Sequence, residues 1–309
     1  MCGDNVEKII EIRADNYAAE IIPSRGANCI SLINKKYKAD ILRKPKNFDK
    51  TENPYVYGMP ILYPVNRISG GKFWFQEREY CFDLNEPDTN CHLHGDIHNA
   101  PFEIAERRED FVKCCFLKKE TKKCPASFRI EISYFLSDAG LSQKTEIFNL
   151  SDHAIPNFLG FHTTFNVPFV KGANSDEITI KADVDWEIER NMENYLPTGK
   201  ILPEDDVTLK IKNGDFYPAE RKISRHYKAK GAGLMEITDH LSRIKIVYRN
   251  DEKFGWRLIL NGDGFVCMEP MTCMVNCQNS AFDRDFAGFD FIEMYSSKTY
   301  VSNIGLEEY

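Results

Sequence analysis

Hydrophobic and polar residues alternate along several stretches of the chain. The longest stretch runs from Ile178 to Ile188, where apolar side chains at every second position are separated by Thr, Lys, Asp and Glu. The same alternation marks residues 128–134, 244–248 and 256–260. A period of two places successive side chains on opposite faces of a strand, so these stretches predict half-buried β-strands.

Turn-forming residues lie between the alternating stretches. Residues 69–71 (SGG), 213–215 (NGD) and 261–264 (NGDG) combine glycine with small polar residues, a composition typical of hairpin turns. We find no comparably long stretch with the helical period of 3.6. The pattern therefore predicts an all-β fold, a large antiparallel sandwich or barrel.

The 309 residues are interpreted as one domain, spanning 1–309. No change in composition, no linker rich in proline or serine and no repeat divides the sequence. The basic stretch at 118–123 lies between two strand-like segments, so it is interpreted as a solvated hairpin turn rather than a ligand-binding patch. A chain of this length can bury roughly three quarters of its unfolded surface, so it needs no disulfide or metal to fold.

Charge and cysteine content narrow the class of protein. The 40 Lys and Arg residues against 47 Asp and Glu give a net charge of -7, which argues against nucleic-acid binding. No apolar stretch approaches the ~18 residues that a membrane-spanning helix needs. The first residues lack the features of an export signal, and the ten cysteines are irregularly spaced without a CxxC pair. We therefore expect a cytoplasmic protein with reduced thiols.

Two segments carry basic or metal-ligating side chains. Arg67 follows an apolar, proline-bounded run and could either present its planar fork of donors at a pocket or form a structural ion pair. His92 and His94 would share a face of a strand and could bind a metal together. Cupin-like barrels follow such a pair with Glu after three or four residues, where this chain has His98 or Asn99. A metal site is therefore not the expected outcome.

Two further segments place a titratable group among apolar residues. His162 is flanked by aromatic residues, which suits either a core histidine or a proton-transfer catalyst held by apolar packing. Glu269 ends an apolar run just before Pro270, and a buried carboxylate is costly without a role or a partner. Glu269 is therefore the best candidate for a general base.

Five motifs occur in the order found in one enzyme family. They are residues 64–73, which contain Asn-Arg-Ile and then Gly before an aromatic strand, Leu-His-Gly at 93–95, Gly-x-His-x-x-Phe-Asn at 160–166, Leu-Pro-Thr-Gly at 196–199 and Cys-x-Glu-Pro at 267–270. On these motifs the chain resembles the aldose 1-epimerase (mutarotase) family of the galactose mutarotase-like superfamily. The resemblance implies a large antiparallel twisted β-sandwich, the galactose mutarotase-like supersandwich, with a sugar bound in an open cleft.

The resemblance also implies roles for individual residues. Glu269 would be the general base, His162 the general acid, and His94 would assist at the ring oxygen or the anomeric end. Arg67 would bind sugar hydroxyls with support from Asn66. Opening a cyclic hemiacetal requires one proton to be taken from the C1 hydroxyl and one to be given to the ring oxygen, so a carboxylate and an imidazole suffice and no cofactor or metal is expected.

One departure from the family pattern bears on the substrate. Many members bind sugar hydroxyls through an Asp after Pro-Thr-Gly, where the nearest counterpart here is the segment 224–227, which contains Arg225. An arginine there would suit an acidic or phosphorylated sugar, whereas Asn66-Arg67-Ile68 is closer to the branch that acts on neutral aldoses. We therefore expect an aldose 1-epimerase that interconverts the α and β anomers of a hexose, with a small-molecule sugar as its only partner class, as a monomer or homodimer.

Three alternatives stay open at this stage. The first is a sugar 6-phosphate mutarotase that uses Arg225. The second is a non-catalytic carbohydrate-binding protein of the same fold, although such a protein would have no need of an acid–base pair. The third is a metal-dependent β-sandwich enzyme.

Overall fold

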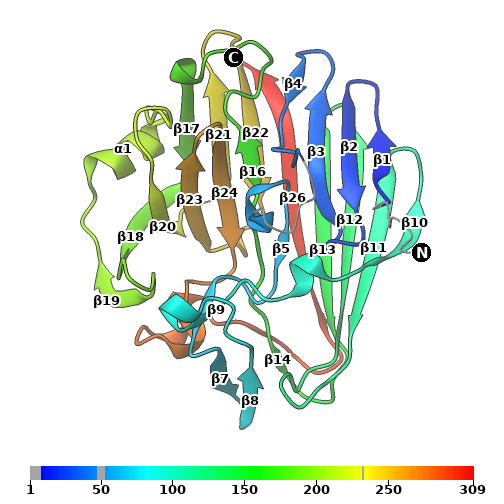
Figure 1. Cartoon of the computed structure of the whole chain (residues 1–309), viewed down its shortest axis with the longest axis vertical. Coiled ribbons are helices and arrows are strands. Elements are labelled where there is room, and N and C mark those ends of the chain that lie inside the picture. Colours follow the sequence, from blue (N-terminus) through cyan, green and yellow to red (C-terminus); the bar gives the residue numbers. More distant parts are fainter. Residues whose placement is uncertain (1–7, 47–52, 232) are drawn as a thin grey trace.

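Most of the regular structure consists of antiparallel β-strands (Figure 1). The computed structural model describes residues 8–46, 53–231 and 233–309. Two eight-stranded sheets and one four-stranded sheet contain most of the strands, and three two-stranded pairs contain the others. The predicted all-β class is therefore confirmed, and the architecture is a large twisted β-sandwich.

The sheets bring together strands that are far apart in the sequence. The first eight-stranded sheet has the order β10 (Glu103–Arg107), β11 (Phe111–Lys118), β12 (Phe128–Ser137), β13 (Gly140–Asn149), β26 (Ser297–Glu308), β22 (Ile244–Asn250), β21 (Leu234–Asp239) and β17 (Ile178–Ala182). The second has the order β19 (Pro197–Ile201), β18 (Val184–Arg190), β20 (Ser224–Ala229), β23 (Trp256–Gly262), β24 (Phe265–Met271), β15 (Gly160–Phe161) and β5 (Ile61–Leu62), with β16 (Thr164–Asn166) also paired to β24.

Smaller elements complete the fold. The four-stranded sheet consists of β1 (Ile10–Arg13), β2 (Tyr17–Ile22), β3 (Asn28–Asn34) and β4 (Ala39–Asp40). The two-stranded pairs are β6 (Arg67–Ser69) with β9 (Cys91–Leu93), β7 (Lys72–Phe75) with β8 (Arg78–Cys81), and β14 (Ile155–Pro156) with β25 (Phe291–Ile292). The helices are α1 (Asp206–Asn213), α2 (Arg284–Ala287) and the 3-10 turns η1 (Pro54–Val56), η2 (Pro87–Thr89), η3 (Ile97–Asn99), η4 (Ser175–Glu177) and η5 (Cys277–Asn279).

Buried aromatic residues join the sheets. Tyr248 of β22 packs edge-on against Phe165 of β16, and its hydroxyl is 2.9 Å from the hydroxyl of Thr163. Tyr134 of β12 donates a hydrogen bond to the carbonyl of Ala27, which precedes β3 in the four-stranded sheet. Burying an aromatic side chain of this size contributes about 1.5–3 kcal/mol, and the hydroxyl of each tyrosine has a partner. These contacts hold the second sheet and the four-stranded sheet against the first.

Three of the four predicted strands are confirmed as β12, β22 and β23. The longest prediction, a single strand over residues 178–188, is wrong because the segment is divided. Residues 178–188 form two strands, β17 and β18, which belong to different sheets. The chain changes sheets at Asp183, where the backbone bonds to Leu234 and Lys230. The alternation of apolar and polar residues continues through Asp183. The sequence pattern therefore does not indicate where one strand ends and the next begins.

The predicted turns differ in their outcome. Residues 261–264 do connect the hairpin of β23 and β24, in which Gly262 pairs with Phe265. Residues 69–71 connect β6 to β7, which pair with other strands, so they form a turn but no hairpin. Gly214 ends α1 in the left-handed conformation, with φ 87°, so the prediction of a hairpin turn at 213–215 is wrong. Asn-Gly favours positive φ equally at a hairpin turn and after a helix.

The basic stretch at 118–123 begins at the last residue of β11 and continues into the connection to β12. Both strands are antiparallel neighbours, so the position agrees with the predicted turn. Within the described ranges, nine cysteines are free thiols. No helix in the described part of the chain has the length and apolar character needed to cross a bilayer.

Candidate active site

His162 and Glu269 face each other across neighbouring strands. β15 and β16 both pair with β24, and His162 lies in the short break between them. The backbone stays connected there, because the amide of Met268 donates to the carbonyl of Thr163. His162 Nε2 lies 3.2 Å from Glu269 Oε1, and the two residues are 6% and 1% exposed. The hydrogen-bonded ladder of the sheet thus fixes an imidazole beside a carboxylate.

Burial controls the protonation of this pair. Loss of hydration raises the pKa of Glu269 well above its usual range, an effect that the positive charges of Arg190 and Arg67 oppose. Burial lowers the pKa of His162 to about 4. Burial thus disfavours the charged form of both groups, so their protonation is coupled. Glu269 Oε1 has no hydrogen-bond donor, so its contact with His162 is electrostatic.

His94 is held next to the pair by a backbone hydrogen bond. The amide of Asn66 donates to His94 Nδ1 at 3.2 Å, and the amide of His94 donates to the Asn66 carbonyl at 3.1 Å. Because Nδ1 accepts, the ring proton of neutral His94 is on Nε2. Burial, followed by repulsion from His162 and Arg67, lowers the pKa of His94 well below its usual range. Its ring is 5.8 Å from that of His162, so His94 is a neutral donor beside the pair.

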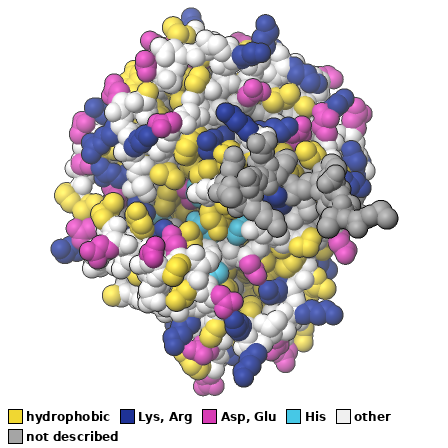
Figure 2. Space-filling model, in the orientation of Figure 1, with side chains coloured by type: hydrophobic (Ala, Val, Ile, Leu, Met, Phe, Trp, Pro, Cys, Tyr) yellow, Lys and Arg dark blue, Asp and Glu magenta, His cyan; other side chains and the backbone are white. Residues whose placement is uncertain are grey.

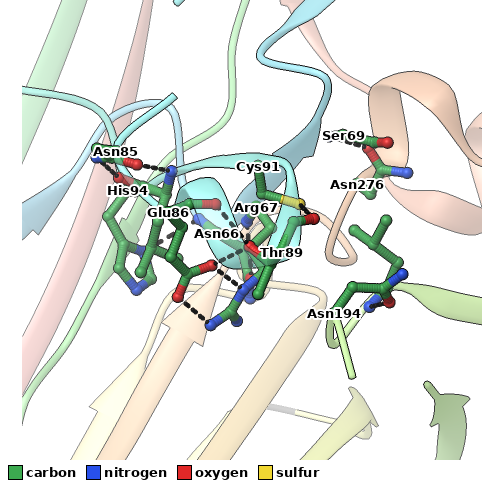
Figure 3. A network of polar contacts seen from close by, with 12 residues as sticks. Asn66, Arg67, Ser69, Asn85, Glu86, Thr89, Cys91, His94, Asn194 and Asn276 are labelled. Carbon is green, nitrogen blue, oxygen red and sulfur yellow. Dashed lines mark hydrogen bonds and ion pairs between the residues drawn. The ribbon is translucent and has the colours of Figure 1, made fainter. Parts of the chain in front are cut away.

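Asn66 organises this corner of the site (Figure 3). Both Asn66 and His94 adopt left-handed backbone conformations, with φ 63° and 64°. The Asn66 side chain accepts from the amide of Arg67 at 2.9 Å, and its amide nitrogen lies 3.6 Å from Met271 Sδ on β24. Asn66 therefore ties the segment that contains Arg67 and His94 to the strand that contains Glu269.

Arg67 is bound by a carboxylate that sequence analysis did not identify. Its Nε and Nη2 donate to the two oxygens of Glu86 at 2.6 and 2.7 Å (Figure 3). Its guanidinium stacks 4.5 Å from the ring of Tyr195. Burial alone would raise the pKa of Glu86, but hydrogen bonds from Arg67 and Thr89 lower it. The positive charge of Arg67 is thus neutralised by a carboxylate of the protein, which is the structural ion pair considered above. The guanidinium nevertheless lies beside His94.

Arg225 is occupied by two carboxylates. Its Nη1 is paired with Glu187 and its Nη2 lies 2.8 Å from Asp205. The carboxylate of Asp205 also caps α1 through the amide of Thr208. A phosphate group at this position would have to compete with both carboxylates, so the arrangement gives no support to phosphate binding by Arg225.

Two more residues belong to the site although no local pattern distinguished them. The ring of Tyr55 lies 4.7 Å from His94 and 6.2 Å from His162, so it covers the imidazoles. Arg190, the last residue of β18, donates to the carbonyl of Ser224 at 2.6 Å. Its charge acts on Glu187, Arg67 and Glu269. Both residues reach the site only through tertiary structure.

Histidine side chains reach the surface on one face of the molecule (Figure 2). Figure 2 shows them near the centre of this face, with hydrophobic side chains around them. A cavity of about 590 Å³ lies beside this site, and Tyr55 and His98 belong to its wall. Phe73, Tyr80 and Phe128 also line the cavity, whereas His162 and Glu269 do not. The aromatic cavity is therefore distinct from the acid–base pair, and Tyr55 lies between the two.

Metal binding by His92 and His94 is not supported by the arrangement of donors, because neither residue belongs to a group of three described side chains that could hold one ion. His92 Nδ1 lies 2.6 Å from the carbonyl of Asp83 and its ring stacks on Phe82, while His94 Nδ1 accepts from Asn66. Among the residues that the structure describes, three donors come close enough for one ion at His162, Cys267 and Glu269.

Comparison with known proteins agrees with the fold. The family model described as Aldose 1-epimerase matches residues 8–288, and the chain belongs to this family. The sequence is 24% identical over 283 residues to the uncharacterized protein YihR of Escherichia coli (strain K12), which covers 89% of this chain and 87% of that protein.

Solved structures give the same result. The chain is similar to a galactose mutarotase-like protein from Clostridium acetobutylicum, with a TM-score of 0.92, 29% identity and coverage of 98% of this chain and 96% of that one. It also shares its fold with a GalM/aldose epimerase homologue from C. elegans, with a TM-score of 0.78, 15% identity and coverage of 97% and 99%.

Proposed function

We propose that this protein is an aldose 1-epimerase that interconverts the α and β anomers of a neutral hexose. The observation that carries the proposal is the buried pair of His162 and Glu269, 3.2 Å apart, in a family of sugar epimerases. Ring opening needs one group that gives a proton and one that takes a proton. A carboxyl group and an imidazole held this close together can supply both.

In the proposed mechanism, the sugar reacts with the form of the site in which Glu269 is ionised and His162 is protonated. Glu269 takes the proton of the C1 hydroxyl, and His162 gives a proton to the ring oxygen as the bond from C1 to that oxygen breaks. The product is the open-chain aldehyde. Rotation about the C1–C2 bond presents the other face of the carbonyl, and the same two groups then run the closure in reverse. Arg190 and Arg67 favour the ionised form of Glu269, which is the form that accepts the proton.

His94 stabilises the reacting oxygens in this proposal. Its Nε2 carries the ring proton because Nδ1 accepts from Asn66, so Nε2 can donate a hydrogen bond to the ring oxygen or to the anomeric oxygen. Its lowered pKa keeps the ring neutral, and a neutral donor does not disturb the proton count of the neighbouring pair. Positioned donors of this kind stabilise charge that develops in the transition state.

The balance of charges favours a neutral sugar. Arg67 is paired with Glu86, and Arg225 is paired with Glu187 and Asp205. Arg190 acts on Glu187 and Glu269. A phosphorylated sugar would need a cation whose charge is not already compensated in this way. The sugar 6-phosphate alternative therefore has less support than the neutral aldose.

Anomer exchange measured by NMR on freshly dissolved aldoses and their 6-phosphates tests the proposal. We expect faster exchange with at least one neutral hexose and little acceleration with the corresponding 6-phosphate. Binding of a sugar without any acceleration would identify a carbohydrate-binding protein instead, which is the other alternative. Faster exchange of the 6-phosphate than of the neutral sugar would show that the charge argument is wrong.

Arg67→Ala should mainly raise KM. The guanidinium lies beside the acid–base pair and has donors suited to sugar hydroxyls, but it takes no part in the proposed proton transfers. We expect KM to rise by about tenfold, equivalent to about 1.4 kcal/mol of binding free energy, with a smaller fall in kcat. Initial rates of mutarotation over a range of sugar concentrations give both constants. An unchanged KM in the folded variant would exclude Arg67 from sugar binding.

A further inference from the structure

A buried thiol lies beside the proposed acid–base pair. Cys267 and Glu269 are two residues apart on β24, so their side chains share a face of the strand. Cys267 pairs in register with Thr164, and its Sγ lies 3.3 Å from the Thr164 hydroxyl. One donor atom from each of Cys267, Glu269 and His162 lies within 4.8 Å of the others, and all three residues are buried.

The distances suit a tetrahedral zinc ion. Zinc binds nitrogen and oxygen at about 2.0–2.2 Å and sulfur at about 2.3 Å, so neighbouring donors around one ion are roughly 3.3–3.7 Å apart. The 3.2 Å between His162 Nε2 and Glu269 Oε1 is just below this range, so these two donors need almost no movement. The thiol would need to approach by about 1 Å at most, given the 4.8 Å limit on the group, which a small side-chain rotation can supply.

The site also contains an unsatisfied acceptor. Glu269 Oε1 is buried, belongs to a residue that is 1% exposed and has no hydrogen-bond donor. An unsatisfied buried acceptor is costly, and a cation would satisfy it. A zinc ion bound by a thiolate, a carboxylate and a neutral imidazole has no net charge, so the loaded site would be neutral in its buried surroundings.

We propose that His162, Cys267 and Glu269 form an inhibitory site for Zn²⁺, or for a similar thiophilic ion such as Cd²⁺. Three protein ligands leave a fourth position for water. Binding displaces the thiol proton of Cys267 and any proton held between His162 and Glu269, and these protons pass to solvent. The sulfur donor discriminates against Mg²⁺ and Ca²⁺, which prefer oxygen ligands. The inhibition rests on the proposed function, because the ion occupies both groups of the acid–base pair. The binding of the ion does not depend on the proposed function.

Calorimetry on the full chain, treated first with a chelator, tests binding without reference to activity. We expect one equivalent of Zn²⁺ to bind, and Cd²⁺ to produce the ultraviolet sulfur-to-metal charge-transfer band. Cys267→Ser keeps a hydroxyl next to Thr164 but loses the thiolate, so affinity should fall by at least about tenfold, or about 1.4 kcal/mol. Cys29→Ser removes another buried thiol, on β3, and should bind Zn²⁺ like the original protein.

The activity measurement separates the two proposals. Zn²⁺ should inhibit mutarotation reversibly, with recovery on chelation, and Cys267→Ser should lose this inhibition relative to its own metal-free rate. Absence of Zn²⁺ binding, or equal binding by Cys267→Ser, would overturn the metal site. Activity that disappears with the chelator and returns with Zn²⁺ would make the ion a cofactor and overturn inhibition. Zn²⁺ binding at Cys267 in a protein with no metal-free mutarotation would uphold the metal site and overturn the proposed function.

Discussion

Glu269→Gln is expected to lower the turnover number for mutarotation by at least ~10²-fold, the range found for positioned acid–base groups. The amide has nearly the same shape as the carboxyl group but cannot take the proton of the C1 hydroxyl. Glu269 is buried and makes no hydrogen bond through Oε1, so the substitution removes little packing. Polarimetry or NMR exchange on a hexose that the original protein accepts measures the effect.

His162→Asn is the partner variant and should lower turnover to a similar extent, because it removes the proposed acid. Since the two groups act as a pair, the double variant should be little slower than either single variant. Melting temperatures must be compared with that of the original protein, because an unfolded variant says nothing about mechanism. Turnover close to the original value in folded Glu269→Gln would remove Glu269 from the mechanism.

The second large effect is loss of stability in acid. Burial is the main cause that lowers the pKa of five of the seven histidines, which are His92, His94, His98, His162 and His226. For His98 and His162 the pKa falls to about 4. The unfolded chain therefore takes up protons at a higher pH than the folded chain does. Their contribution to the free energy of unfolding is complete above pH ~6.5 and is lost as the pH falls below that value.

The size of this loss can be bounded at pH 5. Each histidine with a folded pKa of about 4 costs about 2 kcal/mol there. Glu269 acts in the opposite direction, because its pKa is raised in the folded state, but it is one group against five. We expect the melting temperature to fall by roughly 5–15 °C between pH 7 and pH 5.

His226→Leu provides the matched measurement. His226 is fully buried, and neither of its ring nitrogens has a hydrogen-bond partner, so the substitution removes a titrating group without breaking a hydrogen bond. The variant should lose less stability than the original protein between pH 7 and pH 5. Equal melting temperatures of the original protein at the two pH values would refute the role of the histidines.

Local alternation was sufficient to predict several strands but could not assign strands to sheets. β12, β22 and β23 each begin at the first residue of a predicted stretch. The break at Asp183 was missed because both strands keep the same alternation on either side of it. Helix α1 was also missed, since its eight residues bury only Val207, Thr208 and Ile211 and are too few to show a clear 3.6-residue period.

The candidate site shows the same limit. His94, His162 and Glu269 were singled out from their local sequence, and the structure brings them together. Glu86, Tyr55 and Arg190 were missed, because each joins the site through the pairing of distant segments. The occupation of Arg225 by Glu187 and Asp205 could not be foreseen for the same reason, since the carboxylates lie 38 and 20 residues away in the chain.

In the proposed function, proton transfer and sugar recognition involve different parts of this chain. The proposed acid and base lie on neighbouring segments of one sheet, where backbone hydrogen bonds fix their separation. The arginines that act on Glu269 come from β6 and β18, and each is held by its own partner. Exchanges at these outer positions can therefore change the accepted sugar while the proton-transfer geometry persists. Diversification of substrate range, in nature or in a designed library, should concentrate on the arginines and their carboxylates and leave β24 intact.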